Sequence, residues 1–453
     1  MRPFLLLALL SLLPAAAAAA SDIPAGEAAL GTRSYDDYER PEVCAACHVD
    51  FYQQWTQAMM SQAYVHHWDE IEYFELAVPH AEKDEKVAGV KAGCNGCHAP
   101  LSYLAGDVPP PRPGEGSRAE EGVSCDLCHT ITGFEGDTPY NFNWISEPGR
   151  VKQGPKPGLV SPHHDTVENE FLKTADFCGT CHNEMSPYGI WVKSTHLEWR
   201  EGPYAAQGVP CQQCHMPKAF GPTAKMAEPD MVAQHLFHGA HDEGKLKGAV
   251  ELRMHPEERE TEWDGTAIVK VQLFNGKAGH KIPTGSVEDR LVWLHVTATD
   301  SEGKTWQLPV DPKGFEGEDA TIAADVLAYQ DMGIAKEIPD FAGVQRDGID
   351  PGALDVGDRI FRMPYFDPQG RMTIQQWNTS ALGADYRIGP RETKIETYTW
   401  PLPDDVAEGR VVFEATLNYK KLMDPVADFL DVPAEESETV VINTATTWID
   451  VYE

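Results

Sequence analysis

The chain has 453 residues and a formal net charge of −34, with 71 acidic residues against 37 basic ones. This length predicts two domains, and this charge argues against a protein that binds nucleic acid or anionic lipid. An acidic surface favours a basic protein partner, although it also serves simply to keep a protein soluble. It argues mildly against a site that gathers small anions.

The N-terminus has the pattern of a cleavable signal peptide over residues 1–20. Arg2 supplies a positive charge, Phe4 to Leu13 is apolar, and Ala18-Ala19-Ala20 has the small side chains of a cleavage site. The apolar stretch is too short for a membrane-spanning helix, and no cysteine follows it to carry a lipid. We therefore expect an exported protein, periplasmic or else extracellular, without stable membrane insertion.

Every cysteine then falls into one repeated motif, Cys-x-x-Cys-His, whose five copies use all 10 cysteines. The motif residues are Cys44, Cys47 and His48; Cys94, Cys97 and His98; Cys125, Cys128 and His129; Cys178, Cys181 and His182; and Cys211, Cys214 and His215. This motif is the attachment signal for c-type haem. Two thiols add to the two vinyl groups of one porphyrin, and the histidine is placed to bind the iron. We predict five covalently bound haems c, with the five motif histidines as proximal ligands.

Two other chemistries use a Cys-x-x-Cys pair. A zinc site would leave the histidine after every second cysteine unexplained. A disulfide framework would not place all ten cysteines in identical pairs with two residues between them. The repeated histidine therefore favours haem over both alternatives.

The first motif is followed by a predicted helix from Asp50 to Trp68. Phe51, Trp55, Met59 and Ala63 fall roughly on one face of it. The rest of the predicted first domain, residues 21–250, is rich in Pro and Gly and carries few long periodic segments. About 200 residues are too few to wrap five haems separately, so we expect a loop-rich, mainly α-helical domain in which the porphyrins form much of the core.

The predicted second domain, residues 256–453, contains no cysteine, and the spacing of its apolar residues differs from that of the first domain. Apolar and polar residues alternate in several short segments that Gly, Pro, Asn and Asp separate. The segments are Ala267–Phe274, Arg290–Thr299, Thr393–Trp400, Arg410–Tyr419 and Thr439–Val451. They predict an all-β sandwich, large enough to bury a core of its own.

Histidines outside the motifs are more numerous than the irons require. Of 17 histidines, twelve lie outside the motifs, and five would give each haem a second axial ligand. This surplus favours bis-histidine ligation. His280 has a case of its own, since it lies in a loop flanked by Gly and Pro between two predicted strands. His295 is interpreted as a packed strand residue. The three-residue spacing of His235, His238 and His241 is also compatible with zinc on a helical turn.

Several strings resemble bacterial multihaem c-type cytochromes related to the tetrahaem cytochrome c of nitrifiers. They include Gly122–Thr130, Gly208–Pro217, Ser161–His164, Glu198-Trp199, His235–Gly239 and Gly279–Gly285. The resemblance covers most of the chain after residue 20. It implies electron transfer through stacked haems and a C-terminal β domain that can lend a ligand. By this resemblance, His164, His235 and His280 are the expected distal ligands.

One departure from the family concerns the helix after the first motif. Similar proteins often carry a histidine near the position of Met60, where this chain has Met59-Met60. Either one haem has His/Met ligation, or His66 or His67 reaches the iron instead, or one iron is open. Core packing is an equally good explanation for both methionines. His67, His196 and Met60 complete the set of distal candidates.

The resulting hypothesis is an electron-transfer protein without an enzymatic activity of its own, whose donor and acceptor are unknown redox partners. The first alternative is a multihaem oxidoreductase that acts on nitrite or hydroxylamine at one open haem. Pentahaem nitrite reductases usually carry lysine in their catalytic motif, whereas all five motifs here end in histidine. The second alternative is a filament-forming extracellular cytochrome.

Overall fold

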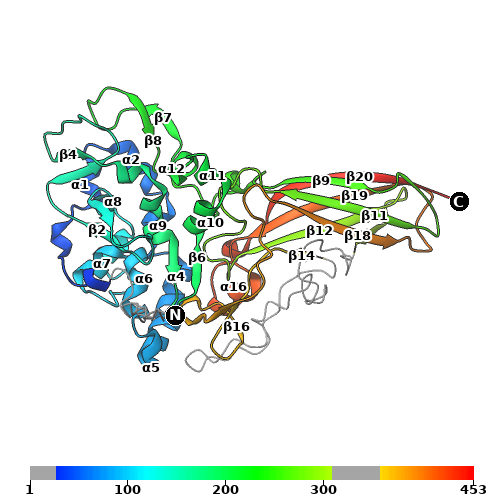
Figure 1. Ribbon diagram of the computed structural model, residues 1–453, viewed down its shortest axis with the longest axis horizontal. Helices are drawn as coiled ribbons and strands as arrows, with labels where there is room; N and C mark the ends of the chain where they lie inside the picture. The colour runs from blue at the N-terminus through cyan, green and yellow to red at the C-terminus, as the bar shows by residue number, and fades with distance from the viewer. Residues whose placement is uncertain (1–26, 309–357) are drawn as a thin grey trace, which may run out of the picture.

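A computed structural model describes residues 27–308 and 358–453, so the predicted signal peptide lies outside the described residues. The chain forms two halves that lie side by side (Figure 1). The first half contains short helices and small hairpins, and the second contains long strands that end at the far tip of the molecule. The predicted class, a mainly α-helical domain followed by an all-β sandwich, is confirmed. No helix of the described ranges is long and apolar enough to cross a membrane.

The helices of the first half are short. They are α1 (Pro41–Ala45), α2 (Val49–Trp55), α3 (Met59–Gln62), α4 (His67–Ile71), α5 (Val78–Lys83), α6 (Val90–His98), α7 (Pro100–Ala105), α8 (Cys125–Cys128), α9 (Ala175–His182), α10 (Thr195–Glu201), α11 (Pro203–Ala206), α12 (Cys211–His215) and α13 (Glu243–Leu246). A π-helical turn, Glu72–Ala77, joins α4 to α5. Helices this short are marginal alone, so tertiary packing must hold them.

The single helix predicted from Asp50 to Trp68 is wrong, because the chain there breaks into α2, α3 and α4. The breaks lie at Ala58 and His66, whose backbones are extended with ψ of 145° and 137°. Contacts with the segment before the third motif account for the first break. The Trp55 indole donates to the carbonyl of Val123 at 2.9 Å, and the Val123 amide donates to the carbonyl of Met60 at 2.9 Å. Tertiary hydrogen bonds thus override the helical periodicity.

Four two-stranded ribbons link these helices. Three are antiparallel and one, β3 with β4, is parallel. Their strands are β1 (Ile131–Phe134) and β2 (Trp144–Ser146), β3 (Val151–Gly154) and β4 (Asp165–Glu168), β5 (Asn183–Met185) and β6 (Trp191–Ser194), and β7 (Lys218–Gly221) and β8 (Asp230–Ala233).

The second half is built from two main sheets that face each other. One has the strand order β18-β11-β9, and the other has the order β10-β20-β19-β12-β13, with β14 also paired to β12. Their strands are β9 (Glu251–Pro256), β10 (Glu260–Glu262), β11 (Thr266–Phe274), β12 (Leu291–Thr299), β13 (Thr305–Gln307), β14 (Arg359–Ile360), β18 (Thr393–Pro401), β19 (Gly409–Lys420) and β20 (Val440–Tyr452). All five predicted strands are confirmed, and β9 fills the gap left between residues 250 and 256.

Smaller elements complete this half. They are a three-stranded sheet of β15 (Tyr365–Phe366), β16 (Met372–Thr373) and β17 (Ala381–Leu382), helix α16 (Asp424–Leu430) and a 3₁₀-helix at Ala434–Ser437. Helix α16 lies where the two halves meet. Its Val426 and Phe429 share one apolar cluster with Trp68 and Tyr73 of the first half and Trp293 of β12.

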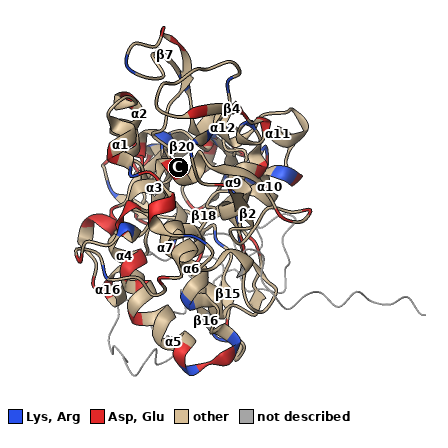
Figure 2. Ribbon diagram, turned by 90° about the vertical axis from the view of Figure 1, so that its left-hand side faces the viewer, with Lys and Arg blue, Asp and Glu red and all other residues tan. Residues whose placement is uncertain are grey.

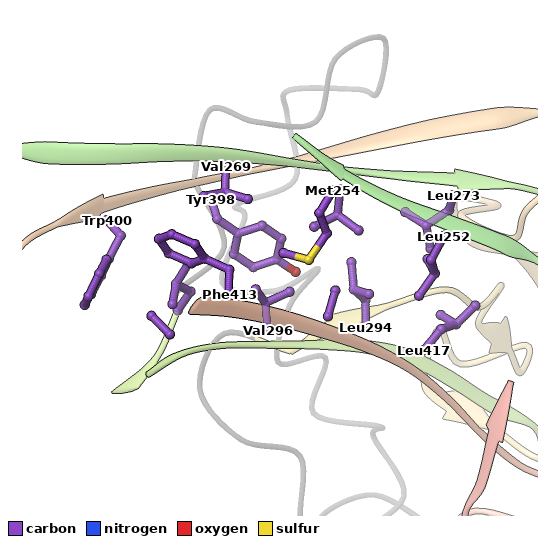
Figure 3. Packing of buried hydrophobic residues seen from close by; sticks show 14 of the residues in the cluster. Leu252, Met254, Val269, Leu273, Leu294, Val296, Tyr398, Trp400, Phe413 and Leu417 are labelled. Atoms are coloured by element: carbon purple, nitrogen blue, oxygen red, sulfur yellow. The ribbon is translucent and has the colours of Figure 1, made fainter. Parts of the chain in front are cut away.

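The core of the sandwich lies between its two main sheets (Figure 3). Burial alternates along β11, as a strand with one face toward a core requires. Val269 and Tyr398 from one sheet meet Leu294, Val296 and Phe413 from the other, and all five side chains are fully buried. Each such side chain contributes about 1.5–3 kcal/mol through burial, so this half has a continuous apolar interior of its own.

Candidate haem site

The first half is built around one large cavity. Its volume is about 3300 Å³, and all ten cysteines and all five histidines of the motifs line its wall. A pocket for a single small ligand holds about 300–1,000 Å³, so this cavity has room for several groups of porphyrin size.

Short helices present the motifs to the cavity. α6, α9 and α12 each contain a whole motif, α8 carries both cysteines of the third, and α1 carries the first cysteine of the first. Side chains three residues apart lie on the same side of a helix. The two cysteines of a motif therefore face the cavity together, and the histidine follows them directly.

Hydrogen bonds to the backbone orient four of the five motif histidines. The Nδ1–H group of His48 donates to the carbonyl of Thr223 at 2.6 Å, and that of His98 to Ala63 at 2.8 Å. Those of His129 and His215 donate to Gln153 and His238, both at 2.7 Å. A carbonyl oxygen only accepts, so the proton lies on Nδ1. The Nε2 lone pair is then free for a metal, the arrangement expected of a metal-ligating histidine.

Three motif histidines face a second histidine across the cavity. The ring centres of His48 and His164 lie 6.2 Å apart, and those of His129 and His235 lie 6.3 Å apart. The third pair, His215 and His280, is also separated by 6.3 Å. Two imidazoles on opposite sides of one metal ion have ring centres about 6.3 Å apart, because the metal–nitrogen bond is about 2.0–2.1 Å long and each centre lies about 1.1 Å beyond its nitrogen. The spacing fits an iron between each pair.

The three facing histidines repeat the orientation of the motif histidines. Nδ1–H of His164, His235 and His280 donates to the carbonyl of Asp165, Ala233 and Lys281 at 3.2, 3.1 and 2.8 Å. Burial also keeps the rings uncharged, since it lowers the pKa of His215 and of His235 to about 4. Neutral imidazoles with a free Nε2 are what metal coordination requires.

His98 and His182 have no such partner among the described histidines. Met59 and Met60 both line the cavity wall. His67 begins α4 with its ring 5.7 Å from that of His66, and it is absent from the cavity lining. The structure thus brings together three of the six distal candidates with a motif histidine, and it leaves two motif histidines without a facing imidazole.

His196, the remaining candidate, has both ring nitrogens occupied. Nδ1 accepts a hydrogen bond from the Asn183 amide at 3.0 Å, and Nε2 lies 2.9 Å from a carboxylate oxygen of Asp176. The ring packs on the fourth motif, where a side chain at Gly179 would meet it at 2.7 Å. Its contacts are those of a packed histidine, so we do not propose it as an iron ligand.

The cavity wall is basic although the chain is strongly acidic. Twelve lysines and Arg290 line it, against five carboxylates. The lysines are Lys86, Lys91, Lys152, Lys156, Lys173, Lys193, Lys218, Lys225, Lys245, Lys247, Lys277 and Lys281. Apolar walls with cations at intervals suit a flat apolar group that carries carboxylates, as haem does. No local pattern in the sequence predicts this set, because these lysines are scattered over almost 200 residues.

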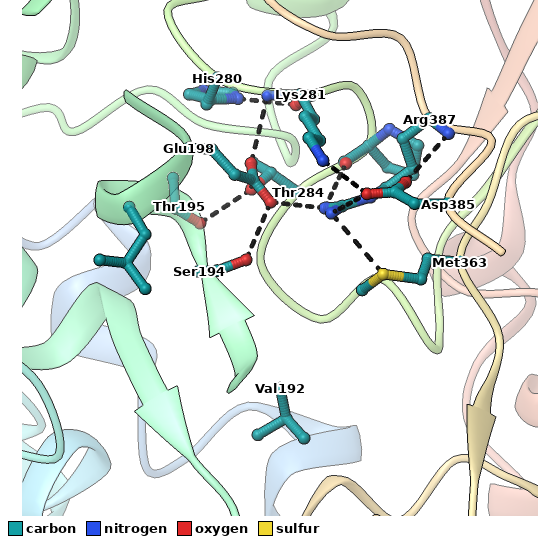
Figure 4. A network of polar contacts seen from close by, with 12 residues as sticks. Val192, Ser194, Thr195, Glu198, His280, Lys281, Thr284, Met363, Asp385 and Arg387 are labelled. Atoms are coloured by element: carbon teal, nitrogen blue, oxygen red, sulfur yellow. Dashed lines mark hydrogen bonds and ion pairs between the residues drawn. The ribbon is translucent and has the colours of Figure 1, made fainter. Parts of the chain in front are cut away.

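An ion-pair network around the buried side chains of Glu198 and Arg387 holds the loop that carries His280 (Figure 4). Glu198 of α10 accepts hydrogen bonds from the Lys281 amide at 3.1 Å and the Thr284 hydroxyl at 2.7 Å. Arg387 donates to Glu198 at 2.6 Å and pairs with Asp385 at 2.9 Å. Burial alone would raise the pKa of Glu198, but Arg387 brings it below its usual value. Sequence reasoning noticed Glu198-Trp199 only through the family resemblance, and it missed Arg387 and Asp385.

The motifs adjoin one another in space. The thiols of Cys44 and Cys125 lie next to each other, as do those of Cys97 and Cys181 and those of Cys178 and Cys211. The first motif therefore adjoins the third, and the fourth adjoins both the second and the fifth. Groups attached to these cysteines would lie next to one another.

Comparisons with known proteins relate the chain to c-type cytochromes. Residues 43–130 match the family "Cytochrome c554 and c-prime", and residues 158–265 match the N-terminal region of the NapC/NirT cytochrome c family. No curated protein matches the chain. A penta-heme cytochrome c552 from Thermochromatium tepidum shares the fold, with 21% identity and a TM-score of 0.60, over 92% of this chain and 100% of that one.

The sporulation control protein Spo0M from Bacillus subtilis is 10% identical with a TM-score of 0.16, over 46% of this chain and 50% of that chain, which is too dissimilar to bear on the site. The motifs, the two family matches and the shared fold together identify the chain as a multihaem c-type cytochrome.

Proposed function

We propose that this protein carries electrons between redox partners in the periplasm by means of five covalently bound haems. The haems supply one-electron redox chemistry. The observation that supports a carrier best is the set of three imidazole pairs, because an iron held on both sides by the protein has no position left for a substrate.

The residues of the chain have three roles in this proposal. The ten cysteines attach the cofactors, and His48, His129 and His215 with His164, His235 and His280 hold three irons. Backbone carbonyls fix these rings, so the ligands need not move when an electron arrives. The adjoining motifs keep the five sites within one continuous cavity.

The exterior of the haem-binding half suggests the type of partner. Acidic positions predominate around α4 and α5 (Figure 2), in a chain whose net charge is −34. We propose basic redox proteins as donor and acceptor, with an encounter that weakens as salt is added. Export to the periplasm rests on the predicted signal peptide and on the compartment in which c-type haem is attached.

A second candidate function rests on His98 and His182. Neither faces a described histidine, so an iron at either motif could remain open or take a methionine. An open iron would permit an oxidoreductase that acts on a small nitrogen compound. Met59 and Met60 line the same cavity and supply the alternative ligand.

Haem number and ligation are tested together on matured protein. Intact mass spectrometry should show an addition of roughly 3 kDa for five attached haems. The His280→Ala variant should keep five haems by mass. Its low-temperature EPR spectrum should show one more high-spin iron than that of the wild type, because the spin state follows the axial ligands. His255→Ala, an exposed position on β9, is the matched control and should leave the spectrum unchanged. An unchanged spectrum for His280→Ala removes His280 from the ligands.

Carbon monoxide binding to the reduced protein separates the two functions. A carrier binds less than one equivalent per chain at neutral pH. A haem with methionine ligation should titrate at a higher potential than the others. One full equivalent of bound carbon monoxide would contradict the carrier and direct assays to nitrite and hydroxylamine.

A further inference from the structure

A second group of metal-binding side chains lies outside the haem-ligand pairs. The donor atoms of His66, His241 and Glu436 all lie within 4.8 Å of one another. His66 precedes α4, His241 precedes α13, and Glu436 lies in the 3₁₀-helix before β20. The cluster thus joins the helical half, the segment between the halves and the sandwich.

The spacing of two of these donors matches one metal ion. Nε2 of His66 lies 3.4 Å from Oε1 of Glu436. Two donor atoms of a tetrahedral zinc site lie about 3.4 Å apart, because each bond is about 2.0–2.1 Å long. The ring of His241 lies 5.5 Å from that of His66 and perpendicular to it, which brings a third donor from another direction.

Charged groups lie close to the outer atoms of the cluster. Nδ1 of His66 lies 3.5 Å from a carboxylate oxygen of Asp69. Oε2 of Glu436 lies 2.9 Å from Nζ of Lys421. A carboxylate behind a ligating histidine fixes its tautomer and makes Nε2 a better donor. His66 and Glu436 therefore keep one atom each for the metal and one for a supporting contact.

Burial favours coordination over solvation. The side chains of His66 and Glu436 are only 12% and 10% exposed. Burial, with Arg290 nearby, lowers the pKa of His241 to about 3, so its ring is neutral and ready to bind. Lys421 and Arg290 are the cations that face the cluster, and Asp69 and Glu436 offset them.

We propose that His66, His241 and Glu436 bind one zinc ion that fastens the sandwich to the haem-binding half. Two imidazoles with one carboxylate suit zinc, whereas calcium and magnesium prefer oxygen ligands alone. Three protein ligands leave the fourth position of a tetrahedral ion to water. The site is independent of the electron-transfer function.

The test uses the complete haem-loaded protein, freed of loose metal with a chelator and then titrated with Zn²⁺ alone. Native mass spectrometry should show one zinc per chain, and zinc should raise the melting temperature, since a ligand that binds only the folded state stabilises it. His241→Ala and Glu436→Gln should each weaken zinc binding by at least tenfold. His255→Ala, an exposed histidine of the sandwich, should bind zinc as the wild type does.

Haem content and EPR are recorded on every variant. Glu436→Gln alters one charge and keeps the shape of the side chain, so it tests the site even where His241→Ala fails to fold. Zinc binding that is absent in the wild type, or unchanged in Glu436→Gln, overturns the proposal. So does a change of one haem from low-spin to high-spin in His241→Ala, because it would assign His241 to an iron instead.

Discussion

The two halves of the molecule obtain their interiors in different ways. The sandwich fills the space between its sheets with side chains such as Leu294, Val296 and Phe413, which are completely buried. The haem-binding half instead surrounds a cavity of about 3300 Å³, and its buried apolar side chains are divided among separate clusters, one of them shared with the second half. Burial of apolar surface is the main favourable term in folding. We therefore expect the sandwich to fold without cofactors and the haem-binding half to need them.

The largest expected effect follows from removing those cofactors. We expect that residues 27–248 lose their folded structure when the protein is made without haem attachment, or when all ten cysteines are replaced by serine. The sandwich should remain folded because most of its core, including Leu294, Val296 and Phe413, lies away from the cavity. Limited proteolysis with mass spectrometry checks this, and a protected fragment should begin near residue 249. Equal resistance of both halves to the protease in the haem-free protein would contradict this difference between them.

A smaller effect is expected at the ion pair between the halves. The Arg387 side chain is 3% exposed and pairs with Glu198 and Asp385. Arg387→Met leaves the buried carboxylate of Glu198 uncompensated and should lower the free energy of unfolding by about 3–5 kcal/mol. Arg253→Met removes an arginine that is 66% exposed and should change little. Retention of wild-type stability in Arg387→Met would mean that water reaches Glu198.

The same ion pair predicts a pH dependence with a definite sign. Burial opposes ionisation of Asp385, but the hydrogen bond and charge of Arg387 lower its pKa to about 2. A lowered carboxyl pKa stabilises the folded state above about pH 4, and this contribution is lost as the pH falls toward 2. The stability difference between wild type and Arg387→Met should therefore shrink over that range.

The core of the sandwich offers the next test. Leu294→Ala opens a cavity at a fully buried position and should cost about 3 kcal/mol. The haem spectra should stay unchanged, because Leu294 does not line the cavity of the first half. Val412→Ala, on the exposed side of β19, is the control. Simultaneous loss of both halves in one thermal transition would show that they unfold as one unit.

The smallest effect concerns a buried carboxyl near the boundary of the halves. Burial raises the pKa of Asp289 to about 7, against the attraction of Arg290 and Lys193. A raised carboxyl pKa stabilises the folded state at acid pH, and this contribution is lost as the pH rises through 7. Asp289→Asn cannot ionise, so above pH 8 it should be more stable than the wild type.

Thermal unfolding across the pH range measures the effect of Asp289→Asn. The difference from the wild type should be small at pH 4, where Asp289 is protonated. Asp264→Asn, at an exposed position, is the control. A variant that is less stable than the wild type at pH 8 would contradict this account of Asp289.

The sequence predicted features that depend on local pattern. The five long strands follow from alternation, and the motif positions follow from chemistry that fixes their spacing. The break of the predicted helix after Trp55 was not predictable, because its causes are hydrogen bonds to Val123, far along the chain. The basic cavity wall and the pair of Glu198 with Arg387 join residues from distant segments, and no local signal connects them.

The hydrogen bonds of the histidine rings also determine how mutations affect the orientation of these rings. Seven rings, four from the motifs and three facing them, donate Nδ1–H to a main-chain carbonyl. Replacing the residue that supplies a carbonyl leaves the carbonyl in place. Most substitutions therefore leave the main-chain acceptors of these rings unchanged. The protein surface could be redesigned for a new partner without altering the orientation of the rings.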